Sequence, residues 1–182
     1  MAVPAILLAA LLLLLYRPAL EHRLFYPWAY FELIDHTAQT QGVDTALLLA
    51  VVRTESSFRP GAVSPVGARG LTQIMPETFE WLQGKTGEAL PPDALFEPEV
   101  SVRYGALLLR TLLDEFGEPE TALAAYHAGR GRVNQWLRDP AVSPDGRTLA
   151  QIPADDTRHY VHKVMKAYGK YEQFLKKQPG KE

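Results

Sequence analysis

The sequence predicts one mainly helical domain preceded by an apolar N-terminal segment. Two observations support this fold class. Apolar residues recur at helical spacing in successive stretches, and Gly or Pro residues stand at the ends of these stretches, where helices begin and end. The 182 residues are enough for one domain. We place at most a small β-hairpin in it, near residues 62–74.

The helices can be assigned in order along the chain. The first is predicted at residues 29–41 and ends at Gly42, and the second follows Asp44, a good N-cap, and runs to Ser57. Further helices are predicted from Pro76, at 99–116, at 118–128, at 133–137, and from Asp155 or Asp156 to about Lys177, with loops at 84–98 and 139–156.

The N-terminal segment is an apolar run without charge, AVPAILLAALLLLLY at residues 2–16. It is shorter than the roughly 17–25 residues of a membrane span and fits the apolar core of a signal peptide. No small-x-small cleavage site follows, because Arg17 and Pro18 come next. We therefore expect residues 1–20 to remain as a signal anchor. A cleaved signal peptide and a buried helix of the domain are the alternatives.

The composition excludes several classes of site. The chain is 47% hydrophobic and 22% charged, as globular proteins are, and its formal net charge of -2 gives no sign of nucleic-acid binding. It has no cysteine, which removes disulfides, thiolate metal sites, thiol nucleophiles and a lipid-modified N-terminal cysteine. The five histidines lack the paired spacing of a zinc motif, so we expect no metal site and no cofactor.

Glu55 is the candidate catalytic residue. It lies near the end of the second predicted helix, as the last residue of the largely apolar sequence DTALLLAVVRTE. Burial disfavours the charged form of a carboxyl group, and a carboxylic acid that is protonated near neutral pH can give a proton to a leaving-group oxygen. A glycine-rich connector follows, in which Ser64 and Gln73 are uncharged hydrogen-bonding groups of the kind that read amides and hydroxyls.

Residues 55–78 read ESSFRPGAVSPVGARGLTQIMPET, an order that resembles the soluble lytic transglycosylase (SLT) family, whose domains share the goose-type lysozyme fold. Two further family blocks recur in the same order, ALAAYHAGRGRV at 122–133 and IPADDTRHYVHKV at 152–164. The resemblance covers roughly residues 30–171. It implies a lysozyme-like transglycosylase domain at residues 25–178.

The resemblance implies a peptidoglycan lytic transglycosylase with Glu55 as its single acid and base. Such an enzyme cleaves the β-1,4 bond between N-acetylmuramic acid (MurNAc) and N-acetylglucosamine (GlcNAc) without water and leaves a 1,6-anhydro-MurNAc end. A hydrolytic muramidase of the goose-type lysozyme class and a non-catalytic peptidoglycan-binding protein are the alternatives. The expected partners are glycan strands and, through the N-terminal segment, the membrane.

The resemblance also implies a location and a set of substrate contacts. A single-pass anchor would hold the domain at the cell membrane on the extracytoplasmic side, where the substrate lies, although Arg17 and Arg23 after the segment favour the opposite orientation. The residues expected to line the sugar cleft or to contact the substrate are Ser64, Gln73, Met75, Tyr126 and Tyr160. Structural roles are the alternative for each.

Two positions depart from the family pattern. His127 stands where the family usually has Asn, and Asp156 stands where it has Glu. An imidazole is larger than an amide and can ionise, and we expect His127 to be structural rather than catalytic. The shorter carboxylate of Asp156 could still serve the start of the last helix.

Overall fold

The computed structural model describes residues 27–177. Within this range the chain forms α-helices and one 3₁₀ helix and no strand, which confirms the mainly helical prediction. The helices are α2 (Phe31–Gln41), α3 (Thr45–Ser56), α4 (Pro76–Thr86), the 3₁₀ helix η1 (Pro92–Phe96), α5 (Pro98–Phe116), α6 (Pro119–Ala128), α7 (Arg130–Trp136) and α8 (Asp155–Lys176).

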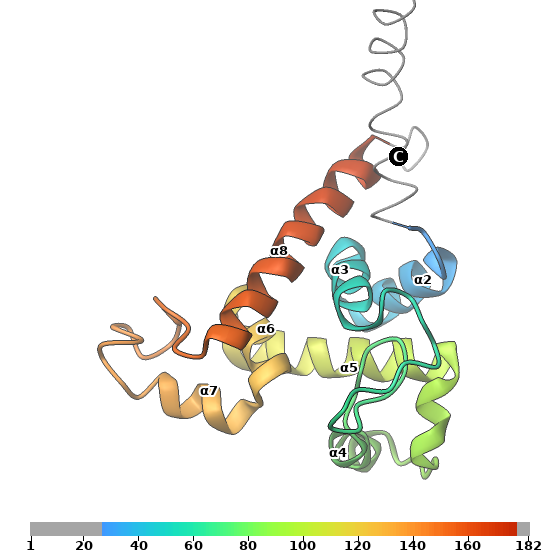
Figure 1. Cartoon of the computed structure of the whole chain (residues 1–182), viewed down its shortest axis with the longest axis horizontal. Coiled ribbons are helices and arrows are strands. Elements are labelled where there is room, and N and C mark those ends of the chain that lie inside the picture. The colour runs from blue at the N-terminus through green and yellow to red at the C-terminus, as the bar shows by residue number, and fades with distance from the viewer. Residues whose placement is uncertain (1–26, 178–182) are drawn as a thin grey trace, which may run out of the picture.

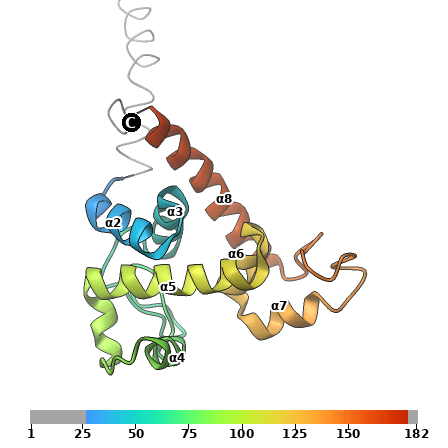
Figure 2. The same cartoon turned by 180° about the vertical axis from the view of Figure 1, so that it is seen from behind.

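The helices are arranged around α5. In Figure 1, α5 crosses the middle of the domain, with α2 and α3 on one side of it and α4 on the other. The long helix α8 runs obliquely past α3 and α6, and both helices contact it (Figures 1 and 2). The end of α3 therefore lies within reach of α6 and α8, which come more than sixty residues later in the chain.

The helix ends follow the predicted signals. The Asp44 side chain accepts a hydrogen bond from the Leu47 N–H at the start of α3, and Pro76 occupies the first turn of α4. Gly42 and Gly117 end α2 and α5 in the left-handed conformation that glycine adopts without steric cost. The predicted boundaries of these helices hold to within a residue or two.

One loop prediction and one helix boundary need correction. The segment 84–98, predicted as a loop, contains the last turn of α4 and η1, because Pro92 suits a helix start and Leu95 is fully buried. The short helix predicted at 133–137 begins earlier, at Arg130. At the site of the possible hairpin, the structure has only isolated bridges, between Val63 and Arg69 and between Arg69 and Ile74.

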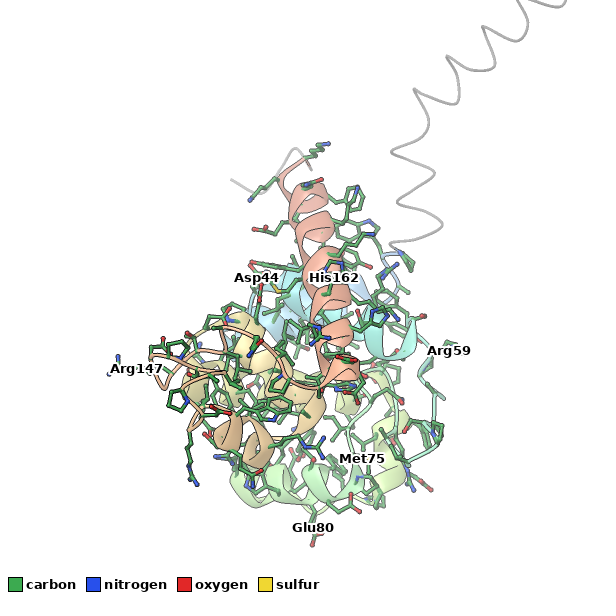
Figure 3. All side chains as sticks on the ribbon, turned by 60° about the vertical axis from the view of Figure 1, so that its left-hand side comes forward. Asp44, Arg59, Met75, Glu80, Arg147 and His162 are labelled. Carbon is green, nitrogen blue, oxygen red and sulfur yellow. The ribbon has the colours of Figure 1, made fainter. Side chains whose placement is uncertain are left out.

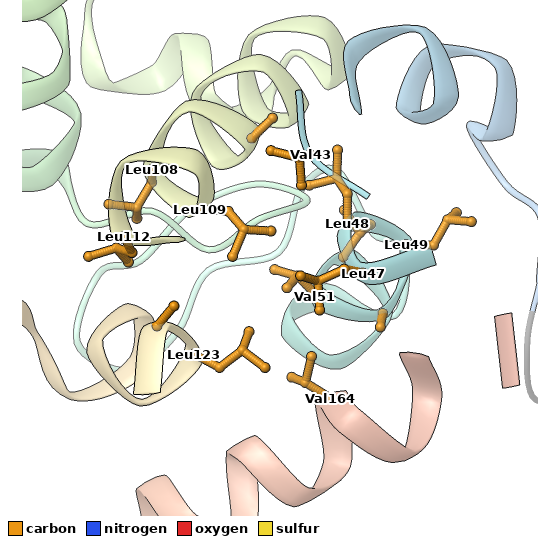
Figure 4. Close-up of a cluster of buried hydrophobic side chains, with 14 of the residues drawn as sticks. Val43, Leu47, Leu48, Leu49, Val51, Leu108, Leu109, Leu112, Leu123 and Val164 are labelled. Atoms are coloured by element: carbon orange, nitrogen blue, oxygen red, sulfur yellow. The ribbon is translucent and has the colours of Figure 1, made fainter. Parts of the chain in front are cut away.

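The hydrophobic core surrounds α3. Its residues 46–52 are almost completely buried, which explains why the sequence there is an unbroken apolar run rather than an alternating one. Figure 4 shows Leu47 and Val51 of α3 facing Leu109 of α5, Leu123 of α6 and Val164 of α8. Because the helix is buried on several sides, a polar residue in its last turn is partly shielded from water.

The predicted signal anchor, residues 1–20, lies outside the described residues. From residue 27 to residue 177, no helix combines the length and the apolar character needed to cross a membrane. The anchor stays a prediction from the sequence.

Candidate active site

Glu55 lies in the last turn of α3, where its carboxylate Oε1 accepts a hydrogen bond of 2.7 Å from the Tyr160 hydroxyl of α8. Burial raises the pKa of Glu55 from 4.5 to about 7, against the opposing effect of the Tyr160 hydrogen bond. This direction agrees with the expectation of a partly desolvated carboxyl group whose pKa is raised. With a pKa near 7, the group can give a proton and take one back at neutral pH.

The backbone turns sharply after Glu55. Ser57 and Phe58 both adopt positive φ angles of 52° and 60°, a left-handed conformation that non-glycine residues seldom take. The Ser57 N–H donates to the Arg53 carbonyl and ends the helix, and Phe58 is buried. Strained backbone of this kind persists where surrounding contacts hold it, and it concentrates at functional sites.

The loop between α3 and α4 folds back against the end of α3. The Ser56 hydroxyl donates to the Leu71 carbonyl at 2.8 Å, which ties the residue after Glu55 to the far side of the loop. Thr72 fastens the loop to α5, because its hydroxyl donates to the Ser101 carbonyl at 2.8 Å. The loop is therefore a fixed wall of the site.

The two polar loop residues singled out from the sequence organise the loop itself. Gln73 has a φ of 49°, and its amide nitrogen donates to the carbonyls of Ala62 and Gly70 at 3.0 and 2.9 Å. The Ser64 hydroxyl accepts the Ala68 N–H at 3.0 Å. Their contacts with sugar, and those of Met75, stay predictions. Met75 is half-buried at the N-cap of α4 (Figure 3).

Two tyrosines from different helices meet near Glu55. The Tyr126 hydroxyl of α6 donates to the Thr72 carbonyl at 2.8 Å, and Tyr160 bonds Glu55 directly. Burial, and after it the charge of Glu55, raises the pKa of each tyrosine well above 10. Both phenols therefore stay neutral hydrogen-bond donors throughout the range in which Glu55 titrates.

A groove of about 340 Å³ opens beside Tyr126. Its lining residues come from α4, α5, α6 and the start of α7: Glu77, Thr78, Trp81, Leu108, Leu112, Ala125, Tyr126, Gly129 and Arg130. Trp81 is 37% exposed, and the Arg130 guanidinium lies over its ring at 5.2 Å. The sequence did not single out Trp81, because a tryptophan on a helix is ordinarily a core residue.

His127 is the second residue whose position the sequence did not reveal. Its ring stacks on the Tyr160 ring, with centroids 4.6 Å apart and planes 27° apart, and its Nδ1 lies 3.1 Å from the Thr157 hydroxyl. Asp156, in the first turn of α8, accepts the Thr157 N–H at 2.8 Å. The N-cap itself is Ala154, which makes no side-chain hydrogen bond there.

Comparison with known proteins identifies relatives of one kind. The family described as "Transglycosylase SLT domain" matches residues 32–145. The soluble lytic murein transglycosylase of Salmonella typhimurium is 34% identical over 160 residues, which are 86% of this chain and 24% of that protein. The membrane-bound lytic murein transglycosylase C of Actinobacillus pleuropneumoniae is 32% identical over 165 residues, which are 78% of this chain and 45% of that protein.

Solved structures agree with these relatives. The lytic transglycosylase Slt of Pseudomonas aeruginosa, crystallised as an inactive Glu-to-Gln mutant, superposes with a TM-score of 0.74 at 36% identity, over 85% of this chain and 26% of that one. A 70-kDa soluble lytic transglycosylase in complex with bulgecin A also gives 0.74, at 30% identity, with 85% and 26% covered. The chain thus spans about a quarter of the length of its soluble relatives.

Proposed function

The chain belongs to the transglycosylase SLT family, and on this premise we propose that it is a peptidoglycan lytic transglycosylase. It cleaves the β-1,4 bond between MurNAc and GlcNAc and leaves a 1,6-anhydro-MurNAc end. The observation that carries the proposal is the buried Glu55 carboxyl group, with a pKa of about 7 and a hydrogen bond from Tyr160. We take residues 25–178 as the transglycosylase domain.

The reaction begins with Glu55 as an acid. Its protonated carboxyl group donates the proton to the glycosidic oxygen, and the bond from C1 of MurNAc to that oxygen breaks. The GlcNAc side leaves with a new hydroxyl group. Glu55 becomes a carboxylate, and the Tyr160 hydroxyl donates to that charge at 2.7 Å.

Glu55 then acts as a base. Its carboxylate takes the proton from the C6 hydroxyl of the same MurNAc, whose oxygen attacks C1 and closes the 1,6-anhydro ring. The proton returns to Glu55, so the cycle consumes no water. An intramolecular hydroxyl needs correct placement more than activation, which suits a site with one acid/base group. Ser64, Gln73, Met75, Tyr126 and Tyr160 supply that placement along the cleft.

The product tests the proposal directly. Digestion of purified sacculi by the full chain should give muropeptides with 1,6-anhydro-MurNAc ends as the main product, identified by mass spectrometry. In water enriched in heavy oxygen, the new ends should carry no label, because the C6 oxygen forms the new bond.

Two other outcomes would replace the proposal. Reducing MurNAc ends that carry the label would identify a hydrolytic muramidase, and Glu77, which lines the groove, would then be the first carboxylate to examine as its second group. Glycan binding without cleavage at any pH would identify a peptidoglycan-binding protein.

The proposal includes a place at the membrane, with the domain on the extracytoplasmic side. It is supported by the uncharged apolar run at residues 2–16 and by similarity to a relative named as membrane-bound. We expect the mature chain to sediment with membranes, and a chain lacking residues 1–20 to remain in the supernatant. A soluble mature chain that starts at or beyond Leu20 by N-terminal sequencing would show instead that the segment is a cleaved signal peptide.

A further inference from the structure

We propose that His127 is a positioning residue for the active site: its imidazole ring, held by Thr157, fixes the Tyr160 ring so that the tyrosine hydroxyl meets Glu55. This inference rests on the proposed function for its catalytic meaning. The structural part of the inference, which concerns one stacked pair and one hydrogen bond, is independent of the proposed function.

The contacts form a continuous series across three helices. Thr157 of α8 holds the His127 Nδ1 of α6 at 3.1 Å, the His127 ring stacks on Tyr160 of α8, and Tyr160 donates to Glu55 of α3 at 2.7 Å. The stacked rings are nearly parallel, a geometry in which aromatic pairs attract beyond their area burial. The series thus connects the exposed His127 to the Glu55 carboxyl group through Tyr160.

The position of His127 in the fold indicates that its side chain orients Tyr160 and does not serve to fill the core. His127 is exposed as a residue, whereas Tyr160 is only 7% exposed. A side chain that covers a buried ring from the solvent side restricts the rotation of that ring without being part of the packed interior. Neighbouring Tyr126 points elsewhere, to the Thr72 carbonyl, so the end of α6 serves the site through two separate contacts.

The surroundings of His127 favour the neutral form of its imidazole. Partial desolvation of its ring lowers its pKa, with the Asp156 carboxylate of α8 opposing and the Arg132 guanidinium of α7 adding to the decrease. On the other side of the stack, Tyr160 stays protonated. Glu55 has a pKa of about 7, and its hydrogen bond from Tyr160 lowers that pKa, so the Glu55 titration reports the position of Tyr160.

The titration of Glu55 tests the proposal without any substrate. In the full chain, with glutamate labelled in its carboxyl carbon, the Glu55 signal is assigned by its absence from Glu55→Gln and followed by NMR against pH. The Tyr160 hydrogen bond lowers the Glu55 pKa, so a displaced tyrosine raises it. We expect His127→Ala to move the midpoint upward by about one pH unit, the scale of a hydrogen bond to a charged group.

Three further variants separate positioning from general disruption. His127→Phe keeps a stacked ring but loses the hydrogen bond to Thr157, so its midpoint should lie between those of wild type and His127→Ala. His162→Ala, which removes an exposed histidine from α8, should leave the midpoint unchanged (Figure 3). In a Tyr160→Phe background, His127→Ala should cause no further shift, because the hydroxyl it positions is gone. Circular dichroism checks that each variant is folded.

Activity gives the second readout. His127→Ala should lower kcat on the order of 10-fold with a smaller change in KM, because a misplaced group costs the chemical step more than binding. An unchanged Glu55 midpoint in folded His127→Ala would overturn the positioning role, and so would a shift that persists in the Tyr160→Phe background. If wild type gives no anhydro ends, the proposed function fails while the titration still decides the role of His127.

Discussion

Replacing Glu55 with glutamine is expected to reduce lytic activity by about 10²–10⁴-fold, the contribution that a positioned general acid and base typically makes. An amide of the same size fills the same space and can still accept a hydrogen bond from Tyr160, but it cannot give a proton to the glycosidic oxygen. Release of muropeptides from sacculi by the two proteins, at equal concentration, measures the loss.

The same variant should gain stability at alkaline pH, which shows that the lost activity is not lost folding. The Glu55 pKa is higher in the folded than in the unfolded chain, so its stabilising proton is fully present below about 4.5 and is lost as pH rises through about 7. Above that, the wild type holds a buried charge that glutamine lacks. From about pH 4 to pH 8, unfolding free energies of variant and wild type should diverge by at most about 3 kcal/mol.

The matched control is Glu80→Gln, which removes an exposed carboxylate from α4 (Figure 3). It should not change the rate of muropeptide release. Activity of Glu55→Gln within a few-fold of wild type would remove Glu55 from the acid/base role. Stability curves that run parallel with pH would mean that Glu55 has no elevated pKa.

The helices and the acid could be predicted because their signals are local. Asp44 and Pro76 mark helix starts by their own hydrogen bonding and ring geometry, and Gly42 and Gly117 mark helix ends. The partial burial of Glu55 followed from the apolar run before it, because residues 46–52 are almost completely buried and leave no polar face for solvent. Each of these inferences uses residues within a few positions of one another.

The family resemblance suggested Tyr160 as a neighbour of Glu55, and the structure confirms this contact. The local sequence pattern could not predict the supporting contacts, because they depend on how distant helices pack. Tyr160 meets Glu55 across 105 positions and His127 meets Thr157 across 30, so no periodicity in the sequence reports either contact. The left-handed turn at Ser57 and Phe58 is equally hidden, since neither residue favours that conformation. The loop contacts hold it in place.

Gly70→Ala is the second variant from which we expect a large effect. Gly70 lies in the loop that forms one wall of the site and has a φ of 78°, a conformation that costs an L-residue roughly 1–2 kcal/mol. A Cβ atom there would stand 1.9 Å from the Leu95 carbonyl oxygen and 2.6 Å from the Ser101 hydroxyl. Adding about 1–3 kcal/mol for overpacking, the variant should lose roughly 2–5 kcal/mol of unfolding free energy in urea.

Two other glycines of the same loop separate the backbone cost of this substitution from its steric cost. Gly67 also has a positive φ, of 94°, but a Cβ there would meet nothing within 4 Å, so Gly67→Ala measures the backbone cost alone. Gly61 has neither a positive φ nor a close neighbour, and Gly61→Ala should stay within about 0.5 kcal/mol of wild type. Equal losses for Gly70→Ala and Gly67→Ala would mean that the loop moves away from Leu95 without cost.

The loss at Gly70 should extend to activity, because the loop cannot move there without moving its neighbours. The Gly70 carbonyl accepts a hydrogen bond from the Gln73 side-chain amide. Two residues later, the Thr72 carbonyl accepts a hydrogen bond from the Tyr126 hydroxyl. A loop displaced from Leu95 withdraws that carbonyl from Tyr126 and shifts the wall that faces Glu55. Folded Gly70→Ala, assayed well below its unfolding midpoint, should therefore release muropeptides more slowly than equally folded Gly67→Ala. Equal rates would show that the close contact of Gly70 with Leu95 does not influence the geometry of the active site.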